Sequence, residues 1–358
     1  MSETTSIAVV SAGVVSAVGL TWPSTCAAVR AGLDGFRETA FVDQVGQTLL
    51  GARIADESLG LSAGGEESVH GGVTRLVTIA VRAAREAALG AGGLVASRCV
   101  FLLLAGGTER AGYSADELKD CYAACEQALG HRFHAASAIL PWGVAGLAGA
   151  LERAKASLAL ADVDHVLLLG LDSLLEVADI QCHLSQGRLL SSQQSDGFIS
   201  GEAGAALVLQ RWRAGESTAS SRPALVLRGA GEADEPASFE SDEPNHGKGL
   251  ARALRAALGE AGLQAHEIHH RLDTAAGESF FMDESSYAWS RVLREREPRG
   301  YTEPLLGAHV GLCGAAQGPL AVALALDMIR KGWAAGGNFL FQAADARERR
   351  CAVVLQGV

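Results

Sequence analysis

A histidine and a cysteine four residues apart, His309 and Cys313, are the pair of side chains best suited to chemistry in this chain. They lie in the glycine-rich segment 307–316, where a thiol beside an imidazole could act as a nucleophile with its base. Such a pair also needs a third group that orients the base, and we find none. A cysteine in this setting is more often a small core residue, and a lone histidine more often structural. We therefore keep His309 and Cys313 only as an alternative catalytic pair.

Two further groups of residues have spacings that could serve a metal. Cys121 and Cys125 are about one helical turn apart, and His266, His269 and His270 cluster before an expected strand. The two groups are too far apart in the chain for a zinc finger, and the histidines fit a solvated loop. The seven cysteines are an odd number and widely spread, which is typical of reduced thiols in a cytosolic protein. We predict no metal site, no cofactor and a cytoplasmic location.

Glycine-bounded apolar strands alternate with alanine-rich amphipathic helices, which predicts an α/β protein with sheets covered on both faces. In the first half we expect strands over 7–15, 99–104 and 165–169, and helices over 75–89 and 144–160. In the second half we expect strands over 224–228 and 271–273, and helices over 248–261 and 314–332. A polar segment rich in breakers, 215–223, separates them. We predict two similar halves, 1–214 and 223–358.

The composition suits a large core of small aliphatic side chains. Of 358 residues, 48% are hydrophobic, 43 are glycine and only 5% are aromatic. The apolar runs are long enough for buried strands but too short for membrane spans. A formal net charge of −11 argues against binding to nucleic acid or to an anionic membrane. It also indicates a protein partner with a neutral or basic face.

Segments along nearly the whole chain resemble the β-ketoacyl synthases of the thiolase fold. The most specific is Asp196–Leu209, DGFISGEAGAALVL, which is similar to the family's "DGFVxGEGAAALVLE". The segment Gly307–Ala316 matches "GHTLGAAGAA" without a gap, and residues 7–21 and 75–89 resemble the opening strand and a following helix. The resemblance implies a thiolase-like α/β fold, built from two repeated halves in five αβαβα layers.

The resemblance also implies that the family's catalytic residues have been lost. Its nucleophilic cysteine corresponds to Val144, and its two histidines correspond to Ala275 and Ala308. The family's lysine corresponds to Glu303, and the glycines of its "GFGG" motif to Leu340, Gln342 and Ala343. Glu202, in the family's buried acidic position, is expected to bond backbone amides rather than to catalyse. The stretch from Gly106 to Val144 looks shorter than in the family, and we expect that no acyl tunnel is kept.

Subunits of this fold associate through an edge strand, which corresponds to residues 133–140. We expect a homodimer or heterodimer through alternate residues of this strand: Phe133, Ala135, Ser137 and Ile139.

The resemblance supports two classes of function. The first is a non-catalytic adaptor or chaperone, either in a bacterial type VI secretion effector cluster, with a secreted effector as partner, or beside an active paralogous ketosynthase. The second is an acyltransferase or β-ketoacyl synthase-like enzyme with altered catalytic residues. Chain-length factors usually keep a glutamine at the cysteine position, and this chain has Val144 there, which favours the adaptor.

Overall fold

The computed structural model describes residues 6–61, 72–130, 132–213 and 224–358. One path of hydrogen-bonded strands runs through the described chain in the order β5-β4-β6-β7-β1-β8-β11-β10-β9. The strands are β1 (Ser6–Ser16), β4 (Cys99–Leu104), β5 (Ala138–Leu140), β6 (His165–Ser173), β7 (Ser200–Trp212), β8 (Leu225–Asp234), β9 (His270–Asp273), β10 (Asn338–Ala344) and β11 (Arg349–Gly357). A hairpin of β2 (Arg37–Val42) and β3 (Thr48–Ala52) joins the side of this sheet at β7.

The path divides into two groups of strands with the same pattern. In one, β1 pairs antiparallel with β7, β7 antiparallel with β6, and β6 parallel with β4. In the other, β8 pairs antiparallel with β11, β11 antiparallel with β10, and β10 parallel with β9. Only two residue pairs, Ala8 with Val226 and Val9 with Leu225, join the groups through β1 and β8. This arrangement agrees with the repeated halves that we predicted; the expected junction, 215–223, lies outside the described residues.

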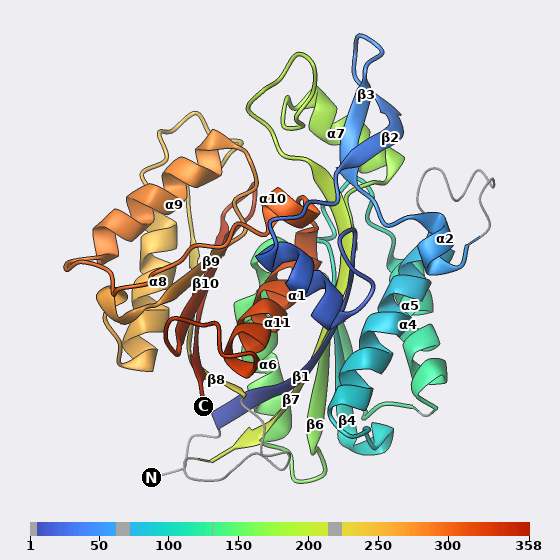
Figure 1. The fold of residues 1–358 in the computed structure, drawn as a ribbon, viewed down its shortest axis with the longest axis vertical. Helices are drawn as coiled ribbons and strands as arrows, with labels where there is room; N and C mark the ends of the chain where they lie inside the picture. The colour runs from blue at the N-terminus through green and yellow to red at the C-terminus, as the bar shows by residue number, and fades with distance from the viewer. Residues whose placement is uncertain (1–5, 62–71, 131, 214–223) are drawn as a thin grey trace.

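Helices cover both faces of each group of strands, giving five layers (Figure 1). Helices α4 (Val73–Gly90) and α5 (Ala115–Leu129) form one outer layer, and α8 (Lys248–Ala261) and α9 (Ser279–Val292) form the other. Helices α6 (Leu147–Leu158) and α11 (Gln317–Arg330) lie between the two groups of strands. Residues 317–328 of α11 are all buried, as expected for a helix in a central layer. The predicted α/β fold with five layers is therefore confirmed.

Small residues allow the outer helices to approach the strands closely. A Cβ atom on Gly13 of β1 would collide with the backbone of α4 at Ala83, and one on Gly229 of β8 would collide with α8 at Ala257. Helix α8 buries a stripe of leucine and alanine, and Gly262 ends it in a left-handed conformation. The high content of alanine and glycine thus follows from tight helix-to-strand packing.

Short elements complete the fold. They are α1 (Trp22–Arg30), α2 (Asp56–Leu59), α7 (Val177–Ser185) and α10 (Gly307–Val310). A separate apolar cluster that includes Phe41, Leu175 and Phe198 packs α7 beside the β2–β3 hairpin. Helix α7 is thereby fixed near the carboxyl end of β6. None of the helices in the described ranges is both long and apolar enough to cross a bilayer.

Candidate functional site

A sharp turn leads from β5 into the central helix α6 and places Val144 at the start of that helix. Gly143 adopts φ +68°, which favours glycine, and its N–H donates to the carbonyl of Ala105 at 2.9 Å. A 3₁₀ turn over Val144–Gly146 then runs directly into α6. The positive end of the helix macrodipole therefore lies at Val144, where it would stabilise a negative charge. Valine carries neither a nucleophile nor a proton for such a site.

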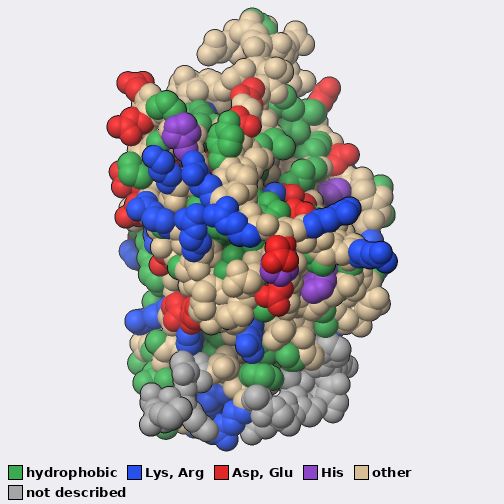
Figure 2. Space-filling model, turned by 90° about the vertical axis from the view of Figure 1, so that its left-hand side faces the viewer, with side chains coloured by type: hydrophobic (Ala, Val, Ile, Leu, Met, Phe, Trp, Pro, Cys, Tyr) green, Lys and Arg blue, Asp and Glu red, His purple; other side chains and the backbone are tan. Residues whose placement is uncertain are grey.

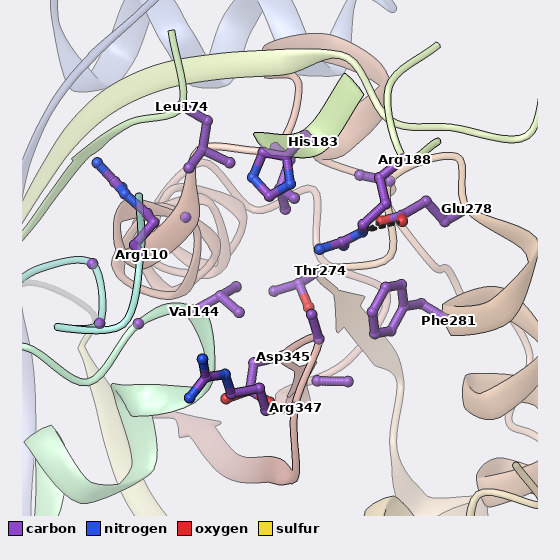
Figure 3. Close-up of a pocket in the computed structure, with 18 of the residues that line it drawn as sticks. Arg110, Val144, Leu174, His183, Arg188, Thr274, Glu278, Phe281, Asp345 and Arg347 are labelled. Atoms are coloured by element: carbon purple, nitrogen blue, oxygen red, sulfur yellow. Dashed lines mark hydrogen bonds and ion pairs between the residues drawn. The ribbon is translucent and has the colours of Figure 1, made fainter. Parts of the chain in front are cut away.

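A cavity of about 340 Å³ opens beside Val144. Its wall comes from both halves of the chain, because the strand ends at Asp172 and Asp273 and the loop residue Ala275 also line it. Figure 3 shows Val144 and Thr274 facing this space, with His183 of α7 above and Arg347 below. A cavity is therefore present at the turn that precedes α6, in contrast to our expectation that no acyl tunnel is kept.

Arginine side chains in the cavity wall are held by buried carboxylates. Arg110 forms ion pairs with Asp172 and with Asp179, the latter at 3.2 Å between Nε and Oδ2. Asp172 also accepts a hydrogen bond from the N–H of Ala315 at 2.9 Å, which connects β6 to the turn before α11. Burial raises the pKa of Asp179, and Arg110 opposes that rise. These contacts fix the wall nearest to Val144.

A second buried ion pair closes the other side of the cavity. Nε and Nη2 of Arg188 donate to the two carboxylate oxygens of Glu278 at 2.8 and 2.9 Å (Figure 3). Burial raises the pKa of Glu278, and Arg188 lowers it. The Arg188 guanidinium also lies 4.8 to 5.6 Å from the centres of three phenylalanine rings: Phe198, Phe239 and Phe281. This pair is a rigid part of the wall rather than a free charge.

Cys182 and His183, neighbours on α7, bring a thiol and an imidazole to the cavity. Nδ1 of His183 is buried and has no hydrogen-bond partner in the described part of the chain. Burial and the nearby Arg188 lower the pKa of His183 to about 4, so the ring is neutral at pH 7. Sequence reasoning missed these two residues and both ion pairs.

Comparison with known proteins identifies the fold. No family model matches the chain, and no curated protein matches it. Several solved structures do match over almost the whole length. The ishigamide ketosynthase/chain length factor matches with a TM-score of 0.75 and 18% identity, covering 99% of each chain. A β-ketoacyl synthase from Burkholderia phymatum STM815 matches with a TM-score of 0.73 and 17% identity, covering 99% of this chain and 100% of the other.

A third match is AntDE:AntF, described as a type II PKS acyl-carrier protein in complex with its ketosynthase. Its TM-score is 0.78 and its identity 15%, covering 99% of this chain and 100% of that one. The chain has the ketosynthase fold. At these identities the comparison establishes the thiolase-like fold that the sequence predicted, and the site residues have to be judged from the structure itself.

Two of the three positions that the sequence resemblance aligned with ketosynthase catalytic residues lie in the cavity. Val144 and Ala275 line it, whereas Ala308 on α10 is exposed and is not among the lining residues. These three positions are thus divided between the cavity wall and the surface.

The alternative catalytic pair is also separated from the cavity. The Cys313 thiol is fully buried and donates to the carbonyl of Val310 at 3.1 Å, and burial raises its pKa. Nδ1 of His309 lies 2.8 Å from the carbonyl oxygen of Leu33. Neither side chain lines the cavity, and no contact between them is seen in the described part of the chain.

Other residues singled out in the sequence have structural surroundings. Glu202 is buried, accepts the N–H of Ile54 at 2.8 Å and pairs with Arg75, as expected of a structural carboxylate. Glu303 pairs with Arg271. Cys121 and Cys125 are buried thiols whose pKa burial raises to about 12. Among the described residues no three potential ligands gather as a metal site.

The edge strand is shorter than we predicted. Residues 133–137 do not extend β5, because the chain turns there: the N–H of Ser137 donates to the carbonyl of His134. Phe133 is buried against the rings of Phe101 and Tyr122. The Ser137 hydroxyl accepts the N–H of Phe101 at 2.9 Å.

The two remaining residues of the expected edge strand lie elsewhere. Ala135 is exposed in the turn, and Ile139 is half-buried in β5, at the end of the strand path. Phe133 and Ser137 therefore make contacts within the chain, and association through alternate residues of 133–140 stays a prediction.

Proposed function

We propose that this protein is a non-catalytic ketosynthase-fold subunit that works by binding another protein. The observation that carries the proposal is Val144 at the start of the central helix. The fold provides the turn and the helix end that would activate a nucleophile, but the side chain there is inert. Cys313 cannot replace it, because its thiol is buried behind the turn with a raised pKa.

We propose that the subunit pairs with its partner through β5, which lies at the end of the strand path. β5 is parallel to β4 on one side, and no described strand pairs with its other side. Two of the similar solved structures are, by name, a ketosynthase/chain length factor and an acyl-carrier protein in complex with its ketosynthase. The partner is either a paralogous ketosynthase or, in a type VI secretion effector cluster, a secreted effector. A homodimer is the simplest form of the same contact.

Co-expression tests this function. The protein is produced with the proteins encoded beside it in its genome, and complexes are analysed by size-exclusion chromatography with light scattering. The proposal expects a complex of defined stoichiometry with one of them, formed without any acyl substrate. A complex that requires a cavity-bound acyl group would argue for a retained substrate site instead.

An enzyme with altered chemistry is the second candidate, and Cys182 beside His183 is the observation that favours it. Both side chains line the cavity, so an acyl group could reach the thiol. The cavity thiol lies on α7, however, and not at the helix end beside Val144. Trapping of an acyl-enzyme on Cys182 would favour this alternative.

A further inference from the structure

The outer layer formed by α8 and α9 carries a band of positive charge, although the chain as a whole has a net charge of −11. Figure 2 faces this layer and shows lysine and arginine side chains gathered across it, with acidic side chains around the band. Lys248, Arg252 and Arg255 project from one face of α8, at positions i, i+4 and i+7, and all three are exposed. Arg291 and Arg294 continue the band at the end of α9. We call these five residues the basic band.

Two adjoining grooves run along the basic band and share Arg255 and Arg291. One, of about 410 Å³, is lined by three arginines, by Tyr287 and by Ser290, with no carboxylate. The other, of about 370 Å³, adds Lys248 and Arg252 together with Pro236, Pro244, Glu235 and Glu243. Arginine and tyrosine are among the residues enriched in the energetic centres of protein interfaces. Tyr287 is 47% exposed here, with arginines on both sides.

Within the described ranges no carboxylate forms an ion pair with any member of the basic band. Three of its arginines are held instead by backbone carbonyls: Arg252 by Asp234, Arg255 by Arg291, and Arg291 by His246. Arg291 lies in the last turn of α9, and Arg255 of α8 donates to a carbonyl of that same turn, where positive charge is favourable. These contacts orient the guanidinium groups and leave their charge without an acidic partner.

Helix stability does not explain the remaining cations. Lys248 is the first residue of α8, where the helix macrodipole disfavours positive charge, and the first turn contains no acidic residue. Glu235, the buried carboxylate nearby, is engaged by the N–H of Gly249 at 2.5 Å. Arg294 lies beyond the end of α9, and no bond from its side chain is seen in the described structure. An acidic group from another molecule would form favourable ion pairs with Lys248 and Arg294.

We propose that the basic band is a docking surface for an acidic segment of a partner protein. The mixed lining favours a protein over a polyanion, because Tyr287, two prolines and Glu243 offer apolar and polar contacts that phosphate groups cannot use. The net charge of −11 also repels nucleic acids and anionic membranes at long range. The net charge indicated a partner with a neutral or basic face, whereas the basic band calls for an acidic segment at this one surface. The inference specifies the partner chemistry of the proposed adaptor.

The test uses the full chain and a fluorescent glutamate-rich helical peptide, with its glutamine-substituted counterpart as a control probe. Anisotropy should show binding of the glutamate peptide that weakens as salt increases. The double variant Lys248→Glu/Arg294→Glu should bind it about tenfold more weakly or worse, whereas Arg37→Glu, a charge reversal on exposed β2, should not. Thermal unfolding confirms that both variants are folded.

Two results with the double variant would overturn the inference. One is equal affinity of the double variant and the wild type for the glutamate peptide. The other is tighter binding of inorganic phosphate or duplex DNA than of the peptide, lost in the same variant, which would make the basic band a phosphate site. The variant Ile139→Lys, aimed at β5, should keep the peptide affinity. Failure of peptide binding with pairing at β5 intact would refute the docking surface alone.

Discussion

Arg188 and Glu278 are 90 residues apart in sequence, yet their side chains are joined by two hydrogen bonds of 2.8 and 2.9 Å in the wall of the cavity. The pair links the segment after α7 to the start of α9, and each side chain is only 7% exposed. A buried pair with this geometry is costly to break from one side, because the remaining charge stays buried without its ion-pair partner.

Removal of one partner should therefore destabilise the protein strongly. We expect Glu278→Gln to lower the free energy of unfolding by about 3 to 5 kcal/mol, measured by urea denaturation. The double variant Arg188→Met/Glu278→Leu should recover most of this loss, because both charges are removed together. If the single and double variants were equally unstable, the pair would matter for its shape rather than for its charge.

His183 predicts a specific dependence of stability on pH. Its pKa is about 4 in the folded protein, mainly because of burial, and 6.5 is the ordinary value expected in the unfolded chain. Between these values the unfolded chain binds more protons, so His183 causes stability to fall as the pH decreases from 6.5 to 4. We expect His183→Gln to remove up to about 3 kcal/mol of that fall at pH 4, measured by denaturation across this range. Parallel pH profiles of the two proteins would contradict the depressed pKa.

The fold could be predicted because its signals are local. Helix α8 has the predicted bounds, 248–261, since an unbroken apolar stripe ends at a glycine. The wall of the cavity could not be predicted in the same way, because Arg188 and Glu278 come from different halves of the chain and no local pattern indicates their contact. One signal was available: Asp172 and Asp273 stand at the ends of apolar strands, where polar groups often gather at a site.

The inert side chain at the turn predicts the absence of acyl chemistry. Purified protein incubated with acyl-CoA, or with an acylated carrier protein, should show no stable adduct by intact mass spectrometry. It should also leave malonyl groups undecarboxylated. An adduct mapped to Cys182 or Cys313 would refute the non-catalytic proposal, and Cys182 is the more accessible of the two.

Pairing through β5 predicts a dimer, either of two copies or with a paralogue. Light scattering should give twice the chain mass at micromolar concentration, or a heterodimer when the partner is present. Ile139→Lys should favour the monomer, since it places a charge on the edge strand. Leu89→Lys is the matched control, because Leu89 is an apolar side chain on α4 that is 78% exposed. If the wild type is a monomer and the Ile139→Lys variant has the same stability, pairing through β5 is refuted.

Introducing the catalytic residues of the ketosynthases should not create a ketosynthase reaction. A thiol introduced by Val144→Cys would lie at the amino end of the central helix, facing the cavity, and should react with iodoacetamide faster than buried Cys313. Adding Ala275→His and Ala308→His should still give no condensation, because Ala308 is exposed outside the cavity wall and cannot complete the cluster. Partner binding should be unchanged by all three substitutions, as expected if the binding surfaces are separate from the cavity. Loss of the partner from the triple variant, measured by light scattering, would instead mean that the cavity itself is the binding surface.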